Sequence, residues 1–237
     1  MEGYLLIDKP KDWTSFDVVG YLRRKIASVS GVAPKKIKVG HSGTLDPFAT
    51  GLLIVLVGKP YTRQAATLLK TDKTYLVTMQ LDASSTTGDP EGTITPNDHP
   101  LSVPDEASIK KAMNKFIGEI TQVPPAYSAI KVNGVRAYRL ARSGQPVMIE
   151  PRRITIHSLD LVSYNYPEVV FEAHVSSGTY IRTLVEDLAK SLNRTGYTKA
   201  LRRTAIGKYS IADAIRAEEI NEHNIESALK GDLAMAR

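Results

Sequence analysis

One stretch of the chain combines a tight loop with a buried strand. Residues 40–51 read GHSGTLDPFATG, with three glycines and one proline around a single carboxylate, Asp46. Glycine permits backbone conformations that other residues adopt only at a cost, and proline fixes one dihedral angle, so this run predicts a tightly folded loop. Six apolar residues follow, 52–57, which is typical of a strand buried on both faces. A loop held by such a strand presents its carboxylate rigidly.

Asp46 is a candidate nucleophile or general base. It is the only acidic residue between Asp17 and Asp72. Asp-Pro is also a common turn dipeptide, in which the carboxylate bonds its own backbone. The residues alone therefore leave a catalytic and a purely structural role open.

Several stretches resemble TruB-type tRNA pseudouridine synthases. Residues 40–51 fill every fixed position of the catalytic motif G-H-x-G-x-L-D-P-x-A-x-G of that family. Residues 5–15, 73–75, 123–131, 178–183 and 201–207 resemble five further motifs. The resemblance implies an α/β (mixed α+β) pseudouridine synthase fold. Its long, mostly antiparallel sheet is flanked by helices and carries a central catalytic cleft.

The resemblance also implies roles in catalysis. Asp46 is the nucleophile, which attacks either C1′ of the sugar or C6 of the base. The target uridine is flipped out of its RNA loop into a pocket. Six further residues are expected to contact or shape the site of the substrate: Tyr75, Tyr180, Arg182, Leu201, His41 and Lys9.

Three of these residues have specific expected roles. Tyr75 stacks on the uracil and takes the C5 proton, and His41 fills the space that the flipped base leaves. Arg182 falls in the first turn of a helix expected at residues 180–192, where the helix dipole disfavours a cation. This position predicts an anionic partner, either Asp46 or a phosphate. From the residues alone, a strand-favouring tyrosine, a turn histidine and a surface arginine are the alternatives.

A basic segment near the middle of the chain predicts contact with RNA. The chain has 31 Lys and Arg against 25 Asp and Glu, a net charge of +6. Between residues 131 and 153 the only acid is Glu150, and Tyr127 and Tyr138 lie close to the cations. We interpret residues 124–153 as an RNA-gripping insertion, with an ordinary basic hairpin as the alternative. The residues expected to bind RNA are Lys131, Arg136, Arg139, Arg142, Arg152, Arg153, Arg202 and Arg203.

Periodicity predicts other elements. Residues 73–81 alternate polar and apolar side chains, which indicates a half-buried strand. Residues 105–120 predict an amphipathic helix whose apolar stripe ends at Ile117. We expect residues 1–237 to form a single catalytic domain, and the chain stops too soon to hold the PUA domain that typical bacterial members of the family carry.

Composition excludes some kinds of chemistry. The absence of cysteine excludes disulfides and thiolate zinc sites. The five histidines, at positions 41, 99, 157, 174 and 223, show no metal-ligand spacing, so no metal and no cofactor are expected. No secretory signal and no membrane-spanning run are apparent, which predicts a cytoplasmic protein.

These observations predict an enzyme that isomerises uridine to pseudouridine in RNA, at uridine-55 in the T loop of tRNA. The expected partner is the T stem-loop of tRNA, and we expect a monomer with no obligatory protein partner. Two alternatives stay open: a non-catalytic RNA-binding or tRNA-folding protein with the same fold, and a basic hydrolase that uses Asp46.

Overall fold

A computed structural model describes residues 1–97, 102–132 and 134–233 of the chain. The chain divides into two compact units, the first made of residues 1–75 and 201–237 and the second of residues 76–200. Strands β4 and β12 each contribute residues to both units. The prediction of one catalytic domain over residues 1–237 stays a prediction.

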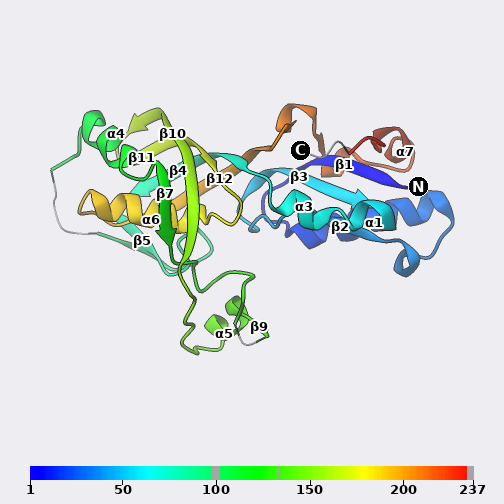
Figure 1. Ribbon diagram of the computed structural model, residues 1–237, viewed down its shortest axis with the longest axis horizontal. Helices are drawn as coiled ribbons and strands as arrows, with labels where there is room; N and C mark the ends of the chain where they lie inside the picture. The colour runs from blue at the N-terminus through cyan, green and yellow to red at the C-terminus, as the bar shows by residue number, and fades with distance from the viewer. Residues whose placement is uncertain (98–101, 133, 234–237) are drawn as a thin grey trace. The chain divides into compact units, whose positions relative to one another are not determined.

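The first unit is built on the antiparallel pair β1 and β3, which runs from Gly3 opposite Val57 to Lys9 opposite Gly51. Strand β14 lies parallel to β1 on one side, and β12 lies parallel to β3 on the other. Strand β2 pairs with β3, and β13 pairs with β12. Figure 1 labels β1, β2, β3 and β12. The elements of this unit are β1 (Gly3–Lys9), α1 (Ser15–Ser30), the 3-10 turn η1 (Pro34–Lys36), β2 (Val39–His41), β3 (Thr50–Val57), α2 (Lys59–Thr62), α3 (Ala65–Leu69), the end of β12 (Gly196–Ile206), β13 (Tyr209–Ser210), η2 (Ile211–Asp213), β14 (Ile215–Arg216), η3 (Ala217–Glu219) and α7 (Ile225–Ala228).

Strand β3 is buried on both faces, as its apolar run predicts. All six residues from 52 to 57 are fully buried. Leu53, Val55 and Val57 pack with apolar residues of α1, and the alternate residues pack in a second cluster with Leu68 of α3. Helix α1 begins at a capping box, in which Thr14 and Asp17 bond each other's backbone N–H groups. The loop before β3 is therefore anchored to a rigid strand.

The second unit is a mostly antiparallel sheet in the order β4-β11-β10-β7, with helices α4 and α6 beside it (Figure 1). Helix α6 buries one face, which includes Leu184 and Leu188. The elements of this unit are β4 (Lys73–Leu81), β5 (Ala83–Ser85), β6 (Ile94–Pro96), α4 (Glu106–Asn114), β7 (Gly118–Gln122), β8 (Lys131–Val132), β9 (Val135–Arg136), α5 (Ala137–Arg142), β10 (Arg152–Asn165), β11 (Glu168–Val175), α6 (Ile181–Ser191) and the start of β12.

The predicted C-terminal end of one helix was wrong. Residues 105–120 were expected to be helical, but α4 ends at Asn114 and Gly118 begins strand β7. Gly118 has a φ of 107°, which removes it from the helical region, and Ile117 is exposed. Pairing of β7 with β10 supplies hydrogen bonds that a longer helix would lose. The strand predicted at 73–81 coincides with β4.

The predicted fold class is confirmed: the chain is a mixed α/β protein whose strands pair mostly in antiparallel fashion. A central cleft stays a prediction. Among the described residues, every helix is too short or too polar to cross a lipid bilayer.

Candidate active site

The backbone around Asp46 is fixed by hydrogen bonds on both sides of the carboxylate. The hydroxyl of the buried Ser15 accepts a bond from the Leu45 N–H at 2.8 Å and donates to the Leu45 carbonyl at 3.2 Å. On the other side, the Asp12 N–H donates to the Pro47 carbonyl at 2.9 Å, and the Ala49 N–H donates to the carbonyl of Asp46 itself. The Asp46 main chain therefore has little freedom to move.

Lys9 supports the same loop from inside the protein. Its side chain is fully buried, and its ammonium group donates to the carbonyls of Pro10 at 2.8 Å, Trp13 at 2.6 Å and Pro47 at 3.2 Å. A buried ammonium group needs such partners to offset its lost hydration. These bonds give Lys9 a supporting role in the loop, and its predicted roles in contacting the substrate and shaping the cleft stay predictions.

Arg203 supports the loop from strand β12. Its Nε donates to the Leu52 carbonyl at 2.7 Å and its Nη2 to the Gly43 carbonyl at 3.1 Å. The β12 backbone lies so close to Gly51 that a Cβ there would sit 2.3 Å from the Arg203 carbonyl oxygen. Gly51 also has a φ of 105°, so two independent constraints require glycine.

Arg203 was predicted to bind RNA, and the structure corrects this prediction. Its side chain is 1% exposed and its guanidinium bonds main-chain carbonyls of the Asp46 loop, so it is a structural support. Its neighbour Arg202 forms a bidentate ion pair with Asp8, with N–O distances of 2.7 and 3.0 Å. Arg202 also lines a cavity of about 490 Å³, and Glu218 and Glu219 line the same cavity. The predicted contact of Arg202 with RNA stays a prediction.

His41 is a neutral side chain at the start of the loop. Burial, followed by the positive charge of Arg203, lowers its pKa from 6.5 to about 4. Its Nδ1 accepts a bond from the Gly43 N–H at 3.3 Å, which leaves the proton on Nε2. At neutral pH the imidazole is therefore an uncharged aromatic ring.

Tyr75 and Leu201 are the other predicted site residues in the first unit, and both are buried. Lys73, two residues before Tyr75, donates its ammonium protons to the carbonyl of Leu69, the last residue of α3, at 2.7 Å and to the carbonyl of Thr71. This contact fixes the chain where β4 begins. Burial lowers the pKa of Lys73 to about 8, with a smaller contribution from the charge of Arg203.

Arg182 lies in the second unit and forms a buried ion pair there. Its Nη1 is 3.0 Å from Oδ2 of Asp89, and both side chains are almost fully buried. The same guanidinium donates to the carbonyls of Thr87 at 2.8 Å and Tyr127 at 2.7 Å. Asp89 is thus one anionic partner of Arg182. The pairing of Arg182 with Asp46 stays a prediction.

Tyr180 precedes α6 and is held through its main chain. Its N–H donates to Oε1 of Gln122 at 2.8 Å, and Nε2 of Gln122 donates back to its carbonyl at 3.0 Å. Gln122 is 1% exposed, so these two hydrogen bonds are sheltered from water. The start of α6 is therefore fixed to β7.

Residues 124–153 connect β7 to β10 and include β8, β9 and α5 (Figure 1); residue 133 lies outside the described residues. The guanidinium groups of Arg139 and Arg142 lie 6.0 and 5.7 Å from the ring centre of Tyr138. A hydrogen bond with Arg139 lowers the Tyr138 pKa. Of the six cations predicted to grip RNA in this segment, all except the half-buried Arg152 are exposed.

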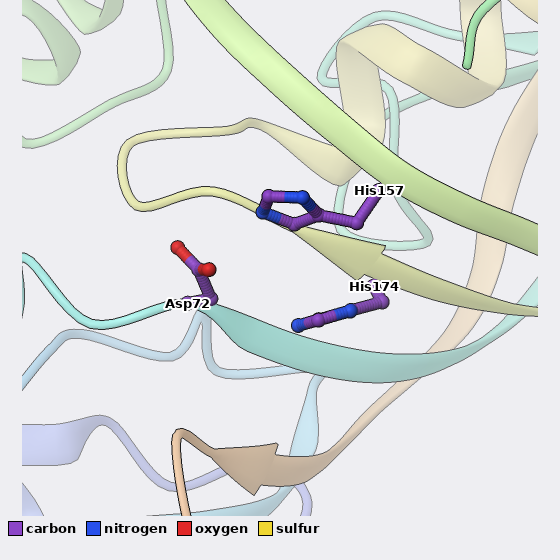
Figure 2. Close-up of side chains that lie close together, drawn as sticks. All are labelled: Asp72, His157 and His174. Atoms are coloured by element: carbon purple, nitrogen blue, oxygen red, sulfur yellow. The ribbon is translucent and has the colours of Figure 1, made fainter. Parts of the chain in front are cut away.

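Two of the scattered histidines lie together in the second unit. Figure 2 shows His157 of β10 beside His174 of β11, with ring centres 4.6 Å apart, and it also draws Asp72, a residue of the first unit. Sequence spacing gives no sign of this pair because pairing of the two strands creates it. His99 lies outside the described residues. The expected absence of a metal stays a prediction.

Sequence reasoning missed several supporting residues. Ser15, Asp89 and Gln122 each bond a predicted site residue or its immediate neighbour. Lys73 bonds the chain that leads into β4, the strand that carries Tyr75. Asp89 lies in a run of Ser, Thr, Gly and Pro that is typical of a surface loop, so nothing in its local sequence indicates burial. Lys73 lies in the stretch 73–75 that resembles a family motif, and this is the signal that could have identified it.

The comparisons with known proteins agree on one family. A model of the TruB family pseudouridylate synthase N-terminal domain matches residues 28–181. The tRNA pseudouridine synthase B of Flavobacterium johnsoniae is 42% identical over 216 residues, which cover 91% of this chain and 93% of the relative. The protein of the same name from Aquifex aeolicus is 42% identical over 221 residues, which cover 92% of this chain and 73% of the relative.

Solved structures show the same fold. The chain is similar to a protein in a crystal structure of a Cbf5-Nop10-Gar1 complex, with a TM-score of 0.69 and 25% sequence identity. The similarity covers 97% of this chain and 60% of that one. A second similar structure is the archaeal box H/ACA sRNP Nop10-Cbf5 complex, with a TM-score of 0.65, 24% identity and coverage of 96% of this chain and 59% of that one.

Proposed function

Because the chain belongs to the TruB family of pseudouridylate synthases, we propose that it converts uridine to pseudouridine in tRNA, at uridine-55 of the T loop. The tRNA substrate is supported by the names of its relatives, which are tRNA pseudouridine synthases B. The position in the T loop and a cytoplasmic location rest on the family resemblance and the sequence.

The observation that carries the proposal is the fixed Asp46 loop. A complete family motif surrounds Asp46, and Ser15, Lys9 and Arg203 hold the backbone on both sides of it. A nucleophile works best when its attack geometry is set before the substrate arrives. The hydrogen bonds described above fix the main chain that carries Asp46 in this way.

The proposed reaction exchanges one bond to the sugar for another. The N1–C1′ bond of uridine breaks, the base turns in its pocket, and C5 bonds to C1′. C5 loses its proton and N1 gains one, so the composition of the RNA does not change. Asp46 is the nucleophile, and it attacks C1′ or C6. The buried Tyr75 stacks on the base and accepts the C5 proton, while Leu201 helps to exclude water from the pocket.

Arg182 and Tyr180 complete the proposed site. Arg182 keeps Asp46 ionised, because an opposite charge within about 4–6 Å favours a carboxylate. Its own orientation is set by Asp89 and two carbonyls. A guanidinium fixed by three partners presents its charge in one direction, which suits a group that must act on a carboxylate.

We also propose that residues 124–153 bind the tRNA backbone. In the insertion, the exposed guanidinium groups of Arg139 and Arg142 lie next to the ring of Tyr138. Cations contact phosphates and aromatic rings stack on bases, and single-stranded RNA offers both.

Tritium release tests the proposal. A T stem-loop RNA labelled with tritium at C5 of uridine is incubated with wild type and with Asp46→Asn. We expect release with wild type and none with the variant, while both bind the RNA. Binding without release by wild type would favour a non-catalytic RNA-binding protein instead. Equal loss of binding and release in Asp46→Asn would contradict the role of Asp46.

A further inference from the structure

Phe16 is an unusually exposed aromatic residue. Its side chain is 69% exposed, whereas Tyr166, the other exposed aromatic residue in the described part of the chain, is 38% exposed. Single exposed apolar residues are common on protein surfaces, so exposure alone indicates nothing. The position and the neighbours of Phe16 distinguish it.

Phe16 is tied to the Asp46 loop. It follows Ser15, whose hydroxyl makes two hydrogen bonds with the backbone of Leu45, the residue directly before Asp46. It stands in the first turn of α1, which the capping box of Thr14 and Asp17 fixes. All these residues belong to the first unit.

The Phe16 ring also contacts the ring of His41. The two centroids are 5.3 Å apart and the planes are nearly perpendicular, at 83°. An edge-to-face contact of this kind orients both rings. Because Phe16 is mostly exposed, much of its ring stays open to a ligand.

The two rings in contact, Phe16 and His41, are both uncharged at neutral pH. His41 is neutral at physiological pH, since burial lowers its pKa to about 4. Asp17, the next residue after Phe16, has its pKa lowered by hydrogen bonds to Thr14 and so is an anion at neutral pH. A nucleobase presents a neutral π-face, which suits the uncharged rings of Phe16 and His41.

We propose that Phe16, with His41 behind it, forms a stacking site for an unpaired nucleobase of the substrate RNA, adjacent to the uridine that Asp46 attacks. This inference rests on the proposed function, and it adds a residue outside the family motifs described above. Stacking accepts any base, so the site holds the RNA loop open without reading its sequence.

The first experiment measures binding of a T stem-loop RNA that carries 2-aminopurine at an unpaired loop position. Stacking quenches the fluorescence of this base. Phe16→Leu keeps an apolar side chain and removes the aromatic face, and Phe16→Tyr keeps the aromatic face. We expect Phe16→Leu to weaken binding by about 5- to 100-fold and to lose quenching, because a stacked base contributes this much to affinity. Phe16→Tyr is expected to resemble wild type.

A double-mutant cycle identifies the base as the ligand. The RNA is made with an abasic nucleotide at each unpaired loop position in turn. At the position that stacks, wild type and Phe16→Leu are expected to bind the abasic RNA equally. A Phe16→Leu defect that persists for every abasic RNA would overturn the inference, as would Phe16→Leu binding and quenching like wild type. The matched control is Val29→Ala, an exposed apolar residue at the other end of α1, which is expected to change nothing.

Thermal unfolding and tritium release show whether a negative result concerns the fold, the proposed function or the stacking site. Thermal unfolding of Phe16→Leu is expected to match wild type, because an exposed ring contributes little to folding; a large fall would assign Phe16 a structural role and overturn the inference. If wild type itself releases no tritium, the proposed function fails. If wild type releases tritium while Phe16→Leu binds normally, only the stacking site fails.

Discussion

The ion pair between Arg182 and Asp89 in the second unit is costly to break. Both side chains are at most 5% exposed, so neither charge has water to replace its partner. Removing one partner of a buried pair typically costs about 3–5 kcal/mol. Arg182 keeps two carbonyl acceptors, which places the expected loss near the lower end.

We therefore expect Asp89→Asn to lower the free energy of unfolding by about 3 kcal/mol in urea denaturation and to reduce tritium release. The matched control is Asp187→Asn, which loses an exposed ion pair with Lys190 on the same helix as Arg182. Exposed pairs contribute little, so this variant is expected to stay close to wild type. Equal effects of the two substitutions would contradict a special role for the buried pair.

His41 gives the stability of the protein a dependence on pH. In the unfolded chain its imidazole binds a proton as the pH falls through 6.5, whereas in the folded protein its pKa is about 4. Between these values only the unfolded state is protonated, so stability falls as the pH falls. Relative to His41→Gln, wild type is expected to lose about 2–3 kcal/mol between about pH 7 and pH 4. Urea unfolding of both proteins across this range measures the difference, and a constant difference would contradict the shifted pKa.

At the scale of the element, the approach of β12 to β3 decides whether the Asp46 loop can form. A Cβ at residue 51 would overlap the backbone of Arg203, which cannot move aside as a flexible side chain can. Gly51→Ala is therefore expected to separate the two strands and to lower the melting temperature by more than 10 °C, or to prevent folding. The control is Gly144→Ala, where φ is also positive, at 72°, but no atom lies within 4 Å. Gly144→Ala carries only the backbone cost, and similar melting temperatures for the two variants would refute the close approach.

The same elements show what could be predicted from the sequence. Strands β3 and β4 were predictable because their apolar patterns match their burial, and the start of α6 was predictable from its turn residues. The end of α4 was not, because Gly118 and the pairing of β7 outweigh a helical apolar pattern. Arg203 was misread as an RNA ligand because its partner Leu52 is 151 positions away, and local sequence gives no sign of that contact.

At the scale of the whole molecule, the surplus of positive charge predicts binding to RNA that weakens with salt. Arg139→Gln with Arg142→Gln lowers the net charge from +6 to +4, and so does Lys110→Gln with Lys111→Gln on α4. If the insertion grips phosphates, only the first pair is expected to reduce the slope of log affinity against log salt, by about 1–2. Fluorescence titrations of T stem-loop RNA between about 50 and 200 mM salt measure both slopes. Equal changes would assign the effect to net charge and not to the insertion.

The pairing of β3 with β12 also determines when, during synthesis of the chain, the Asp46 loop gains its full set of contacts. A ribosome adds about 5–20 residues per second, and Arg203 follows Leu52 by 151 positions. For roughly 8–30 seconds after the loop has been synthesised, the carbonyls of Gly43 and Leu52 therefore lack the guanidinium that holds them in the finished protein. The proposed nucleophile is positioned only after Arg203 has been synthesised, so a nascent chain that contains Asp46 but not yet Arg203 is not yet an enzyme.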